Sequence, residues 1–452
     1  MNQNKNYFIQ TFAIMILSII AFVFIKPFLP TKLFPVADTT MKNIVVDSLM
    51  LEALAEEDSN TNNNDTLKDG SQFVDFNESD YVGYQHLVSF YEKLLQIENG
   101  NNDKIRIAFF GDSMNDGDMI VQDFRSNFQD RFGGEGVGFV NVTSESAASR
   151  ITIKQQFSKK WKSYSFVNTK NLSTSFGISG NVFFPKDTAA TNWVSFEASK
   201  IKHLTELNNP TLFYGKSESN NGQVLVIRGK DTLYKDLKPS QMVNELALGS
   251  SSQKLKLDFK NAGNVPIFGV DFSGKTGVYV DNFSNRGNSG LPITSIKPAV
   301  LSSFNKDLQY DLIVLQYGTN VLGYGSKNFT WYENKMKKVL AHLQEAMPNV
   351  PILIISIADK STKYDSKMQT DSAVIPLMRA QLNYAKQSNA TFVNLFQLMG
   401  GEGSMIKWAD EEPKKANKDY THFNFRGAKV VSDLIYDKIM FGYDEYKKQS
   451  NK

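Results

Sequence analysis

Three short polar blocks carry the residue types that nucleophilic catalysis needs. The blocks are Gly-Asp-Ser at 111–113, Gly-Thr-Asn at 318–320, and Asp419 followed three residues later by His422. The first two blocks end apolar runs, IRIAFF and DLIVLQY, which have the length and composition of buried strands. Because ligands bind at the carboxyl ends of the strands in an α/β sheet, we expect both blocks to lie at one edge of such a sheet.

These residue types point to a serine nucleophile with a histidine base. A carboxylate at 419 can accept the Nδ1 proton of His422, which leaves Nε2 free to deprotonate the hydroxyl of Ser113. Ser113 is predicted to precede a helix, whose amino terminus favours developing negative charge. The amide of Asn320 can donate to an oxyanion, a bond typically worth about 3 kcal/mol in rate.

Each block also has an ordinary explanation. Asp112 and Ser113 can simply cap a helix, and Asn320 can fix a turn. A lone histidine is most often a surface residue, which is the interpretation for His86, His203 and His342. The occurrence of all three blocks, in this order and at these predicted positions, favours catalysis.

Composition excludes several other kinds of site. The chain has no cysteine, so thiol nucleophiles, thiolate metal sites and disulfides are excluded. With four histidines in all, a multi-histidine zinc site would need nearly all of them to converge. The net charge of +3, from 50 basic and 47 acidic residues, gives no strong field for nucleic acid. We predict no metal or organic cofactor and no nucleic-acid partner.

An apolar amino-terminal segment predicts a membrane anchor. Residues 7–25 carry no charged side chain and have about the length of a helix that crosses a bilayer; a buried core helix is the alternative. Lys5 and Lys26 flank the segment without a small-residue cleavage pattern, which favours an uncleaved signal anchor. We expect residues 1–30 to cross the inner (cytoplasmic) membrane of a bacterium once. Residues 31–78 would form a partly disordered tether to a catalytic domain in the periplasm or extracytoplasmic space.

The rest of the chain divides by the period of its apolar residues. In residues 79–164 and 281–445 strand-like runs alternate with helical patterns, the first at 81–97, which predicts a parallel sheet covered by helices on both faces. Residues 165–280 instead hold short β-like runs separated by turn residues, including QVLVIRG and TGVYVD. The sequence therefore predicts one discontinuous α/β domain interrupted by an inserted β-sandwich.

With these blocks the sequence resembles the SGNH, or GDSL-like, hydrolase superfamily. The blocks of that superfamily are Gly-Asp-Ser near the start, a glycine block, Gly-x-Asn, and Asp-x-x-His near the end. Three of them match at 111–113, 318–320 and 419–422, with methionine instead of leucine at position 114. The resemblance implies a three-layer α/β/α, flavodoxin-like fold with about five parallel strands, and ester hydrolysis or acyl transfer.

The resemblance also implies a role for each matched residue. Ser113 would be the nucleophile and, through its backbone N–H, the first oxyanion donor. Asn320 would be a further donor, His422 the base, and Asp419 the group that orients the imidazole.

The glycine block is the least defined of the four. It must lie between the insert and Gly318, where NRGNSGLPITSI is the stretch that fits. Gly290 is expected to supply the remaining oxyanion contact through its N–H, with Gly287 as the second choice. Asp112 and Gly318 are expected to support the site.

Within the superfamily, the layout looks most like the peptidoglycan O-acetylesterase group and its acetyltransferase relatives. In that group a Gly-rich turn follows the first helix, as in DRFGGEGVGFV here, and a carbohydrate-binding-like β-sandwich precedes the glycine block. The resemblance implies a serine esterase that removes O-acetyl groups from a cell-wall or extracellular polysaccharide through an acetyl-serine intermediate. The alternatives are an O-acetyltransferase served by an integral-membrane acyltransferase partner, and a non-catalytic glycan-binding scaffold.

Overall fold

The computed structural model describes residues 13, 16–18, 47–53, 81–159, 161–170, 172–186, 192–324 and 327–450. The chain divides into two compact units, Met1–Ile44 and Val45–Lys452. In the first unit the described residues are helical. Among all described residues, no helix is long and apolar enough to cross a membrane; the predicted span, residues 7–25, lies almost wholly outside them.

The second unit is built on a parallel sheet that contains the predicted apolar runs. Its six strands follow the order β1-β19-β16-β15-β2-β14, of which five run parallel while β1 pairs antiparallel at the edge. Their bounds are β1 Tyr81–Val82, β2 Lys104–Gly111, β14 Gly277–Ser284, β15 Leu312–Gln316, β16 Ile352–Ile355 and β19 Thr391–Val393. The predicted α/β class with five parallel strands is confirmed. The prediction that a helix starts at residue 81 is wrong, because Tyr81 and Val82 form a strand that pairs with β19.

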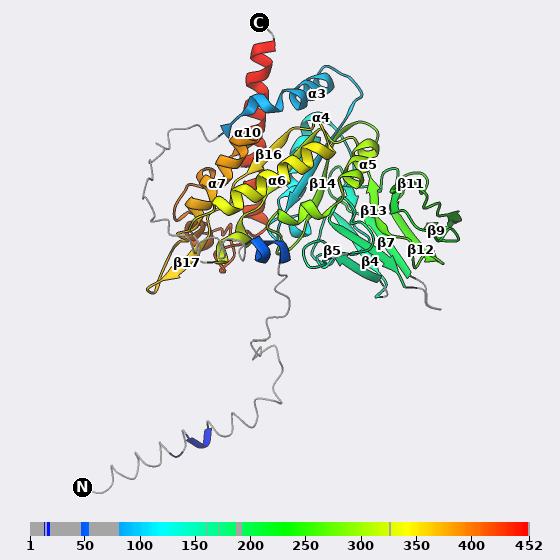
Figure 1. Ribbon diagram of the computed structural model, residues 1–452, viewed down its shortest axis with the longest axis horizontal. Coiled ribbons are helices and arrows are strands. Elements are labelled where there is room, and N and C mark those ends of the chain that lie inside the picture. Colours follow the sequence, from blue (N-terminus) through cyan, green and yellow to red (C-terminus); the bar gives the residue numbers. More distant parts are fainter. Residues whose placement is uncertain are drawn as a thin grey trace, which may run out of the picture. The chain divides into compact units, whose positions relative to one another are not determined.

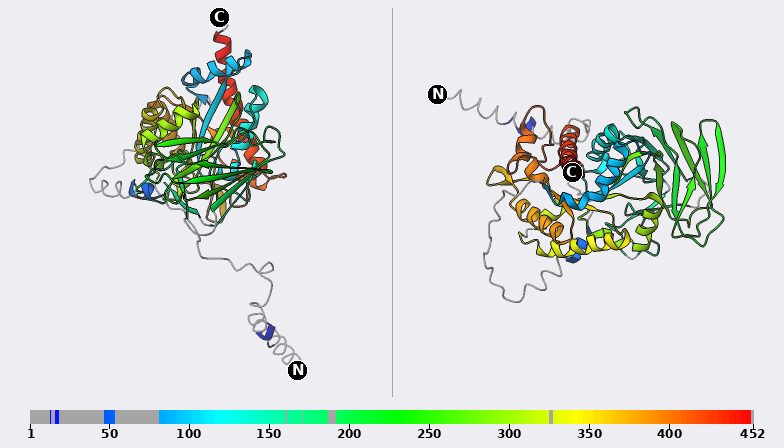
Figure 2. Two further views of the ribbon diagram at one scale, coloured as in Figure 1. Left: turned by 90° about the vertical axis from the view of Figure 1, so that its right-hand side faces the viewer. Right: turned by 90° about the horizontal axis from the view of Figure 1, so that it is seen from above.

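Helices cover both faces of this sheet. Along β2, Ala108 and Phe110 belong to one buried cluster, and Ile107 and Phe109 belong to another, because successive strand residues point to opposite faces. The first cluster includes residues of α5 (Pro298–Leu308), α6 (Thr330–Ala346) and α7 (Val374–Gln387); the second includes residues of α3 (Val88–Glu98), α4 (Val121–Phe132), α9 (Ser404–Asp410) and α10 (Phe425–Ser450). Figure 1 and the right-hand view of Figure 2 show α6 and α10 on opposite sides of the sheet.

Short elements complete the α/β part of the unit. They are η2 Tyr84–Leu87, η3 Asp116–Asp118, η4 Leu291–Ser295, η5 Thr319–Tyr324 and α8 Leu395–Leu398, with the hairpin β17 Ser361–Tyr364 and β18 Lys367–Thr370. Residues 48–53, inside the stretch 31–78 predicted as a tether, are helical. Met50 and Ala53 are buried in the core on the α5–α7 side, so this part of the stretch is packed against the domain.

Between β2 and β14 the chain forms two antiparallel sheets. Their orders are β10-β9-β12-β7-β4 and β11-β8-β13-β6-β5, with β3 also paired to β13. The bounds are β3 Gly138–Val140, β4 Ile153–Phe157, β5 Trp161–Ser165, β6 Asn181–Pro185, β7 Asn192–Ala198, β8 Thr211–Gly215, β9 Gln223–Arg228, β10 Asp231–Asp236, β11 Val243–Ala247, β12 Lys254–Lys260 and β13 Ile267–Phe272. Both sheets contribute to one buried cluster, for example Leu257 from β12 and Val270 from β13.

The limits of this β-rich part differ from the predicted 165–280. Its strands already begin before residue 165, with β4 at Ile153. The sequence did not indicate β4, because buried and exposed residues alternate there in a largely polar segment without an apolar run. At the other end, β14 begins at Gly277 and pairs with β2 over eight residues, so TGVYVD belongs to the parallel sheet.

A buried arginine joins the parallel sheet to the antiparallel strands. Arg106 on β2 is fully buried, and its guanidinium donates to both carboxylate oxygens of Asp281 on β14, at 2.7 and 2.9 Å. The same guanidinium donates to Asp271 on β13 and, at 3.1 Å, to Oγ of Ser273. Burial alone would raise the pKa of Asp271, but the guanidinium lowers it below its usual value. β2 and β14 are therefore joined by charge as well as by pairing, and β13, in another sheet, is joined to them by charge.

We predict that Arg106→Met destabilises the protein by about 3 to 5 kcal/mol, because two buried carboxylates lose their counter-charge. The free energy of unfolding in urea measures the effect. The matched control is Lys154→Met, which removes an exposed ion pair to Glu197 between β4 and β7 and should cost about 1 kcal/mol or less. Equal losses in the two variants would contradict the importance given to Arg106.

Candidate functional site

The strand β2 brings Ser113 to the carboxyl edge of the parallel sheet. The strand ends at Gly111, where a Cβ would lie 2.5 Å from Nδ2 of Asn115, so the turn excludes larger residues. The N–H of Asn115 donates to the carbonyl of Asp112 at 3.2 Å and closes the turn. The helix predicted directly after Ser113 begins only at Val121, with η3 in between. The expected help from a helix amino terminus is therefore not available to Ser113.

Ser113, His422 and Asp419 form a continuous chain of hydrogen bonds. Oγ of Ser113 lies 3.1 Å from Nε2 of His422, and Nδ1 of His422 lies 2.8 Å from Oδ2 of Asp419. With the proton on Nδ1, the ring donates to the carboxylate and its Nε2 accepts from the serine hydroxyl. The structure brings Ser113 together with Asp419 and His422, the pair predicted from its spacing, in the geometry that proton transfer requires.

The loop that carries Asp419 and His422 holds itself in place. Oδ1 of Asp419 accepts from the backbone N–H groups of Thr421 and His422, both at 3.0 Å. Burial alone would raise the pKa of Asp419, but its bonds to the backbone and ring of His422 lower that pKa below the usual value. The carboxylate therefore stays ionised, as an orienting group must. The carbonyl of Tyr420 accepts from the N–H of Ser361 on the β17–β18 hairpin at 3.0 Å.

Asp112 is a buried carboxyl directly before the serine. Its Oδ1 accepts from the N–H of Met114 at 2.9 Å, and its Oδ2 lies 3.3 Å from the donating Nδ2 of Asn320. Burial raises the pKa of Asp112 to about 6, and the nearby His422 only partly offsets this. Asp112 thus connects the Gly-Asp-Ser turn to the Gly-Thr-Asn turn.

Asn320 reaches the site from the end of β15. Besides Asp112, its Nδ2 donates to the carbonyl of Asn288 at 3.1 Å, so the amide faces both Asp112 and the turn after β14. Gly318 has φ 139°, and a Cβ there would lie 2.9 Å from Cβ of Ile357, which explains why glycine is needed. The structure therefore brings Asn320 next to the Gly-Asp-Ser turn, as the spacing of the blocks led us to expect.

The assignment of the glycine block to Gly290 is not supported by the structure. Gly290 is buried against Tyr317 and Met336, and its N–H already donates to Oδ1 of Asn288 at 2.9 Å. Gly287 is partly exposed, and its N–H donates to no acceptor within the described ranges. Its neighbour Asn288 contacts Asn320 directly, so Gly287 is the better candidate for an oxyanion donor.

Asn288 was not singled out from the sequence, yet it organises this turn. Its side chain binds Gly290 through Oδ1 and donates to the Tyr317 hydroxyl at 3.3 Å, while its carbonyl accepts from Asn320. The only available signal was an asparagine inside a glycine-rich stretch, which usually indicates a turn.

The remaining histidines have ordinary surroundings. Nε2 of His342 bonds to the carbonyl of Ile296 at 2.8 Å, and Nε2 of His203 bonds to the exposed Asp130 at 2.6 Å. Within the ranges that the structure describes, no group of His, Asp and Glu residues is arranged to hold a metal ion.

Comparison with known proteins agrees with this arrangement. Residues 249–430 match the family model described as the GDSL-like Lipase/Acylhydrolase family, a span that contains Gly287, Asn320, Asp419 and His422. Ser113 lies before the matched span, so its connection to the site rests on the geometry. No curated protein matches the chain in sequence.

A solved structure of a peptidoglycan O-acetylesterase shows the same fold over most of the chain. A peptidoglycan O-acetylesterase superposes with a TM-score of 0.67 at 18% identity, covering 81% of this chain and 100% of that chain. A Bacillus subtilis protein covers 63% of this chain and 90% of its own at 9% identity and a TM-score of 0.31, and an acetyl xylan esterase covers 35% and 79% at 18% identity and a TM-score of 0.25. The first similarity shows a shared fold, whereas the TM-scores of the other two are too low to show one.

The raised pKa of Asp112 predicts how stability depends on pH. The folded protein holds a proton on Asp112 that the unfolded chain releases between about pH 4 and pH 6, so this group makes stability fall as pH rises through that window. In Asp112→Asn the side chain cannot ionise. The unfolding free energy of the variant, relative to that of the wild type, should therefore rise by about 3 kcal/mol between about pH 3 and pH 7. Urea unfolding at both values tests this, and a constant difference would show that Asp112 ionises normally.

Proposed function

We propose that this chain is a serine esterase, because residues 249–430 match the GDSL-like lipase/acylhydrolase family model and the chain shares the fold of a peptidoglycan O-acetylesterase. The substrate would be an O-acetylated cell-wall or extracellular polysaccharide, and the reaction would pass through an acetyl-serine intermediate. The observation that carries the proposal is the 3.1 Å separation of Ser113 Oγ from His422 Nε2, with Asp419 on the far side of the ring.

In the first half-reaction, Nε2 of His422 takes the proton of the Ser113 hydroxyl as Oγ attacks the acetyl carbonyl carbon. The oxyanion would accept from the N–H groups of Ser113 and Gly287 and from Nδ2 of Asn320. Asn320 would have to turn its long 3.3 Å bond from Asp112 toward the oxyanion. Collapse of the tetrahedral intermediate breaks the ester bond, and His422 protonates the departing sugar oxygen.

In the second half-reaction, a water gives its proton to His422 and attacks the acetyl-serine, which releases acetate and restores the serine. The His422 side chain is 39% exposed, so water can reach Nε2 from the open rim of the sheet. This chemistry calls for no metal or organic cofactor.

Acetyl transfer is the alternative outcome of the same first step. The exposed imidazole that admits water would equally admit a sugar hydroxyl, and the residues required are the same. An acetyltransferase would need a supply of acetyl groups, for which an integral-membrane acyltransferase partner is the natural source. The proposed location is the periplasmic or extracytoplasmic face of the bacterial inner membrane, with residues 7–25 as the anchor.

We predict that Ser113→Ala lowers kcat/KM for 4-nitrophenyl acetate by at least about a thousandfold, because no nucleophile remains. The matched control is Ser303→Ala, which removes a half-buried hydroxyl from α5 and should leave kcat/KM unchanged. Release of 4-nitrophenolate measures both. Activity of the Ser113→Ala protein comparable to the wild type would reject Ser113 as the nucleophile.

Product analysis separates hydrolysis from transfer. The wild-type protein is incubated with an O-acetylated peptidoglycan oligosaccharide and an unacetylated acceptor, and the masses of both are followed. Loss of acetyl from the donor with release of acetate supports the esterase, whereas gain of acetyl by the acceptor supports the transferase. A glycan that binds unchanged would support the scaffold alternative.

A further inference from the structure

A polar groove opens beside the proposed catalytic residues. It has a volume of about 210 Å³, and its lining includes Asp116 and Arg286, whose side chains form an ion pair. Asp116 stands three residues after Ser113, and Arg286 immediately precedes Gly287. The N–H of the lining residue Asn285 donates to the carbonyl of Gly111 at 3.1 Å, so the groove lies next to the turn that carries Ser113. Residues of the antiparallel strands β5 and β6 also line it.

Amides and hydroxyls make up most of the lining of the groove, together with the aromatic rings of Tyr164 and Phe183. The amides and hydroxyls include those of Asn141, Thr143, Ser163, Asn181 and Asn285. Glu145 and the Asp116–Arg286 pair supply the charged groups among the lining residues, which gives the described groove a small excess of negative charge. Such a surface suits a neutral, hydroxyl-rich ligand and disfavours a strongly anionic one.

One lining group is buried and lacks a protein partner. Oδ1 of Asn141 is shielded from solvent and accepts no hydrogen bond from the described residues, although the Asn141 carbonyl accepts from Gln155 at 2.6 Å. An unmade hydrogen bond of a buried acceptor costs free energy, so Oδ1 of Asn141 would bind a ligand donor favourably once its side chain turned toward the groove.

We propose that this groove is a subsite that binds one neutral sugar unit of the acetylated glycan, next to the unit that carries the ester. The assignment rests on the proposed function for the identity of the ligand. The volume is below the ~300 to 1,000 Å³ of pockets that enclose a whole ligand, which fits a single unit of a longer chain. β5 and β6 would thus contribute to substrate selection while the parallel sheet carries the chemistry.

The test fills the groove without touching the catalytic groups. Ser163 is exposed on the edge strand β5, so Ser163→Trp should lower kcat/KM for an O-acetylated peptidoglycan oligosaccharide by at least about tenfold, and leave kcat/KM for 4-nitrophenyl acetate within about twofold. The matched control is Thr232→Trp, an exposed residue of the edge strand β10 that does not line the groove. Equal kcat/KM for the oligosaccharide in both variants would overturn the proposal.

A binding measurement separates failure of the subsite from failure of the esterase assignment. Calorimetric titration of the same oligosaccharide into the Ser113→Ala protein requires no turnover. Loss of binding when Ser163→Trp is added supports the subsite even if the wild type hydrolyses no ester. Unchanged affinity in the Ser113→Ala/Ser163→Trp protein would overturn it.

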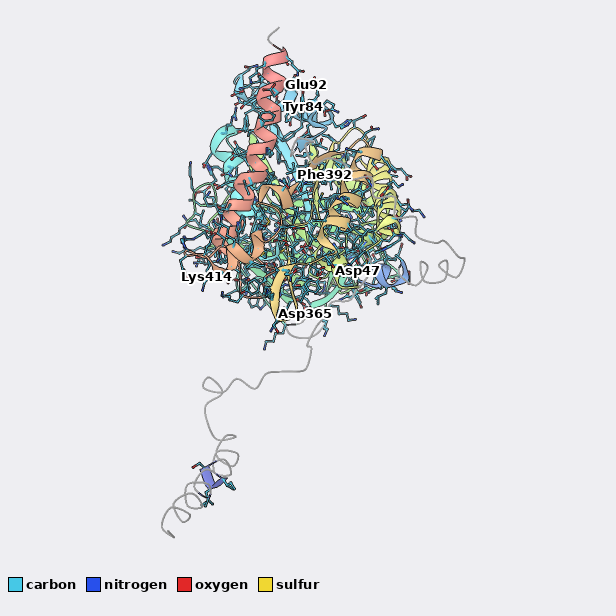
Figure 3. All side chains as sticks on the ribbon, turned by 90° about the vertical axis from the view of Figure 1, so that its left-hand side faces the viewer. Asp47, Tyr84, Glu92, Asp365, Phe392 and Lys414 are labelled. Atoms are coloured by element: carbon cyan, nitrogen blue, oxygen red, sulfur yellow. The ribbon has the colours of Figure 1, made fainter. Side chains whose placement is uncertain are left out.

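A second, independent observation concerns the segment that precedes the catalytic domain. Oδ2 of Asp47 accepts from the backbone N–H of Ser289 at 2.9 Å and from its hydroxyl, and Oδ1 accepts from the N–H groups of Leu49 and Met50, both at 3.1 Å. Asp47 is 3% exposed. Figure 3 places it at the same end of the domain as Asp365 and Lys414, opposite Tyr84 and Glu92.

Ser289 follows Gly287 by two residues and is itself buried. Its carbonyl accepts from the Tyr332 hydroxyl at 2.6 Å, and its Oγ accepts from the N–H of Leu291 at 3.2 Å. Asp47 therefore accepts from both donors of Ser289, its N–H and its hydroxyl, and Ser289 in turn holds the Gly287 turn to the core. We infer that Asp47 is a positioning residue, which sets the N–H of Gly287 through Ser289.

Steady-state kinetics of full-length variants on 4-nitrophenyl acetate tests this role. Asp47→Ala should lower kcat by about tenfold or more with little change in KM, since small misplacements of catalytic groups are costly. Asp47→Asn keeps an acceptor oxygen and should recover part of the loss. The matched control is Glu52→Ala. Glu52 lies on the helical segment that follows Asp47, and the change removes its exposed ion pair to Lys170. A lower melting temperature with unchanged kcat in Asp47→Ala would reduce Asp47 to a structural residue and overturn the inference.

Hydrogen exchange gives a readout that does not depend on turnover. In Asp47→Ala the amides of residues 285–291 should exchange faster than in the wild type, while those of β15 should not change. Identical exchange of residues 285–291 in both proteins would equally overturn the inference.

Discussion

The site depends on a guanidinium that has no access to water. Arg106 is held by Asp281 and Asp271, and this fixes β14 beside β2 in one register. In that register Ser284, the last residue of β14, pairs with Gly111, the last residue of β2. A slip of one residue would turn every side chain of a strand to the opposite face, so the buried charges select this alignment. In it, the turns that follow β2 and β14 leave the sheet side by side.

The groups proposed for chemistry lie on turns, yet buried polar contacts hold those turns. Asn320 bonds to Asn288 and lies close to Asp112, so the turns after β2, β14 and β15 are joined to one another. The loop of His422 is attached separately through Asp419 and the hairpin at Ser361. The turns that carry the proposed oxyanion donors are therefore held in place before substrate arrives, and only the Asn320 amide has to turn from Asp112 toward the oxyanion.

Much of the fold and of the proposed site could be predicted from the sequence. Long apolar runs predicted β2 and β15, because strands buried on both faces need apolar residues throughout. The spacing of Asp419 and His422 predicted their hydrogen bond, because that contact is local. The placement of Ser113 beside His422 followed from the order of the blocks along an α/β chain.

Features set by distant partners could not be predicted in the same way. The choice between Gly287 and Gly290 depends on which N–H Asn288 occupies, and the paired strand β4 lacks an apolar signal. TGVYVD was misassigned because an apolar run does not reveal which sheet it joins. Asp47 lies in a stretch predicted as a tether, and its role appears only through its contact with Ser289, 242 residues further along the chain.

The central claim is that His422 activates Ser113. The most direct measurement is covalent labelling with a fluorophosphonate, followed by peptide mass spectrometry. We expect a single label on Ser113 in the native protein, with a labelling rate at least about a hundredfold lower in His422→Ala. Labelling of a different residue, or an equal rate with and without the imidazole, would contradict it.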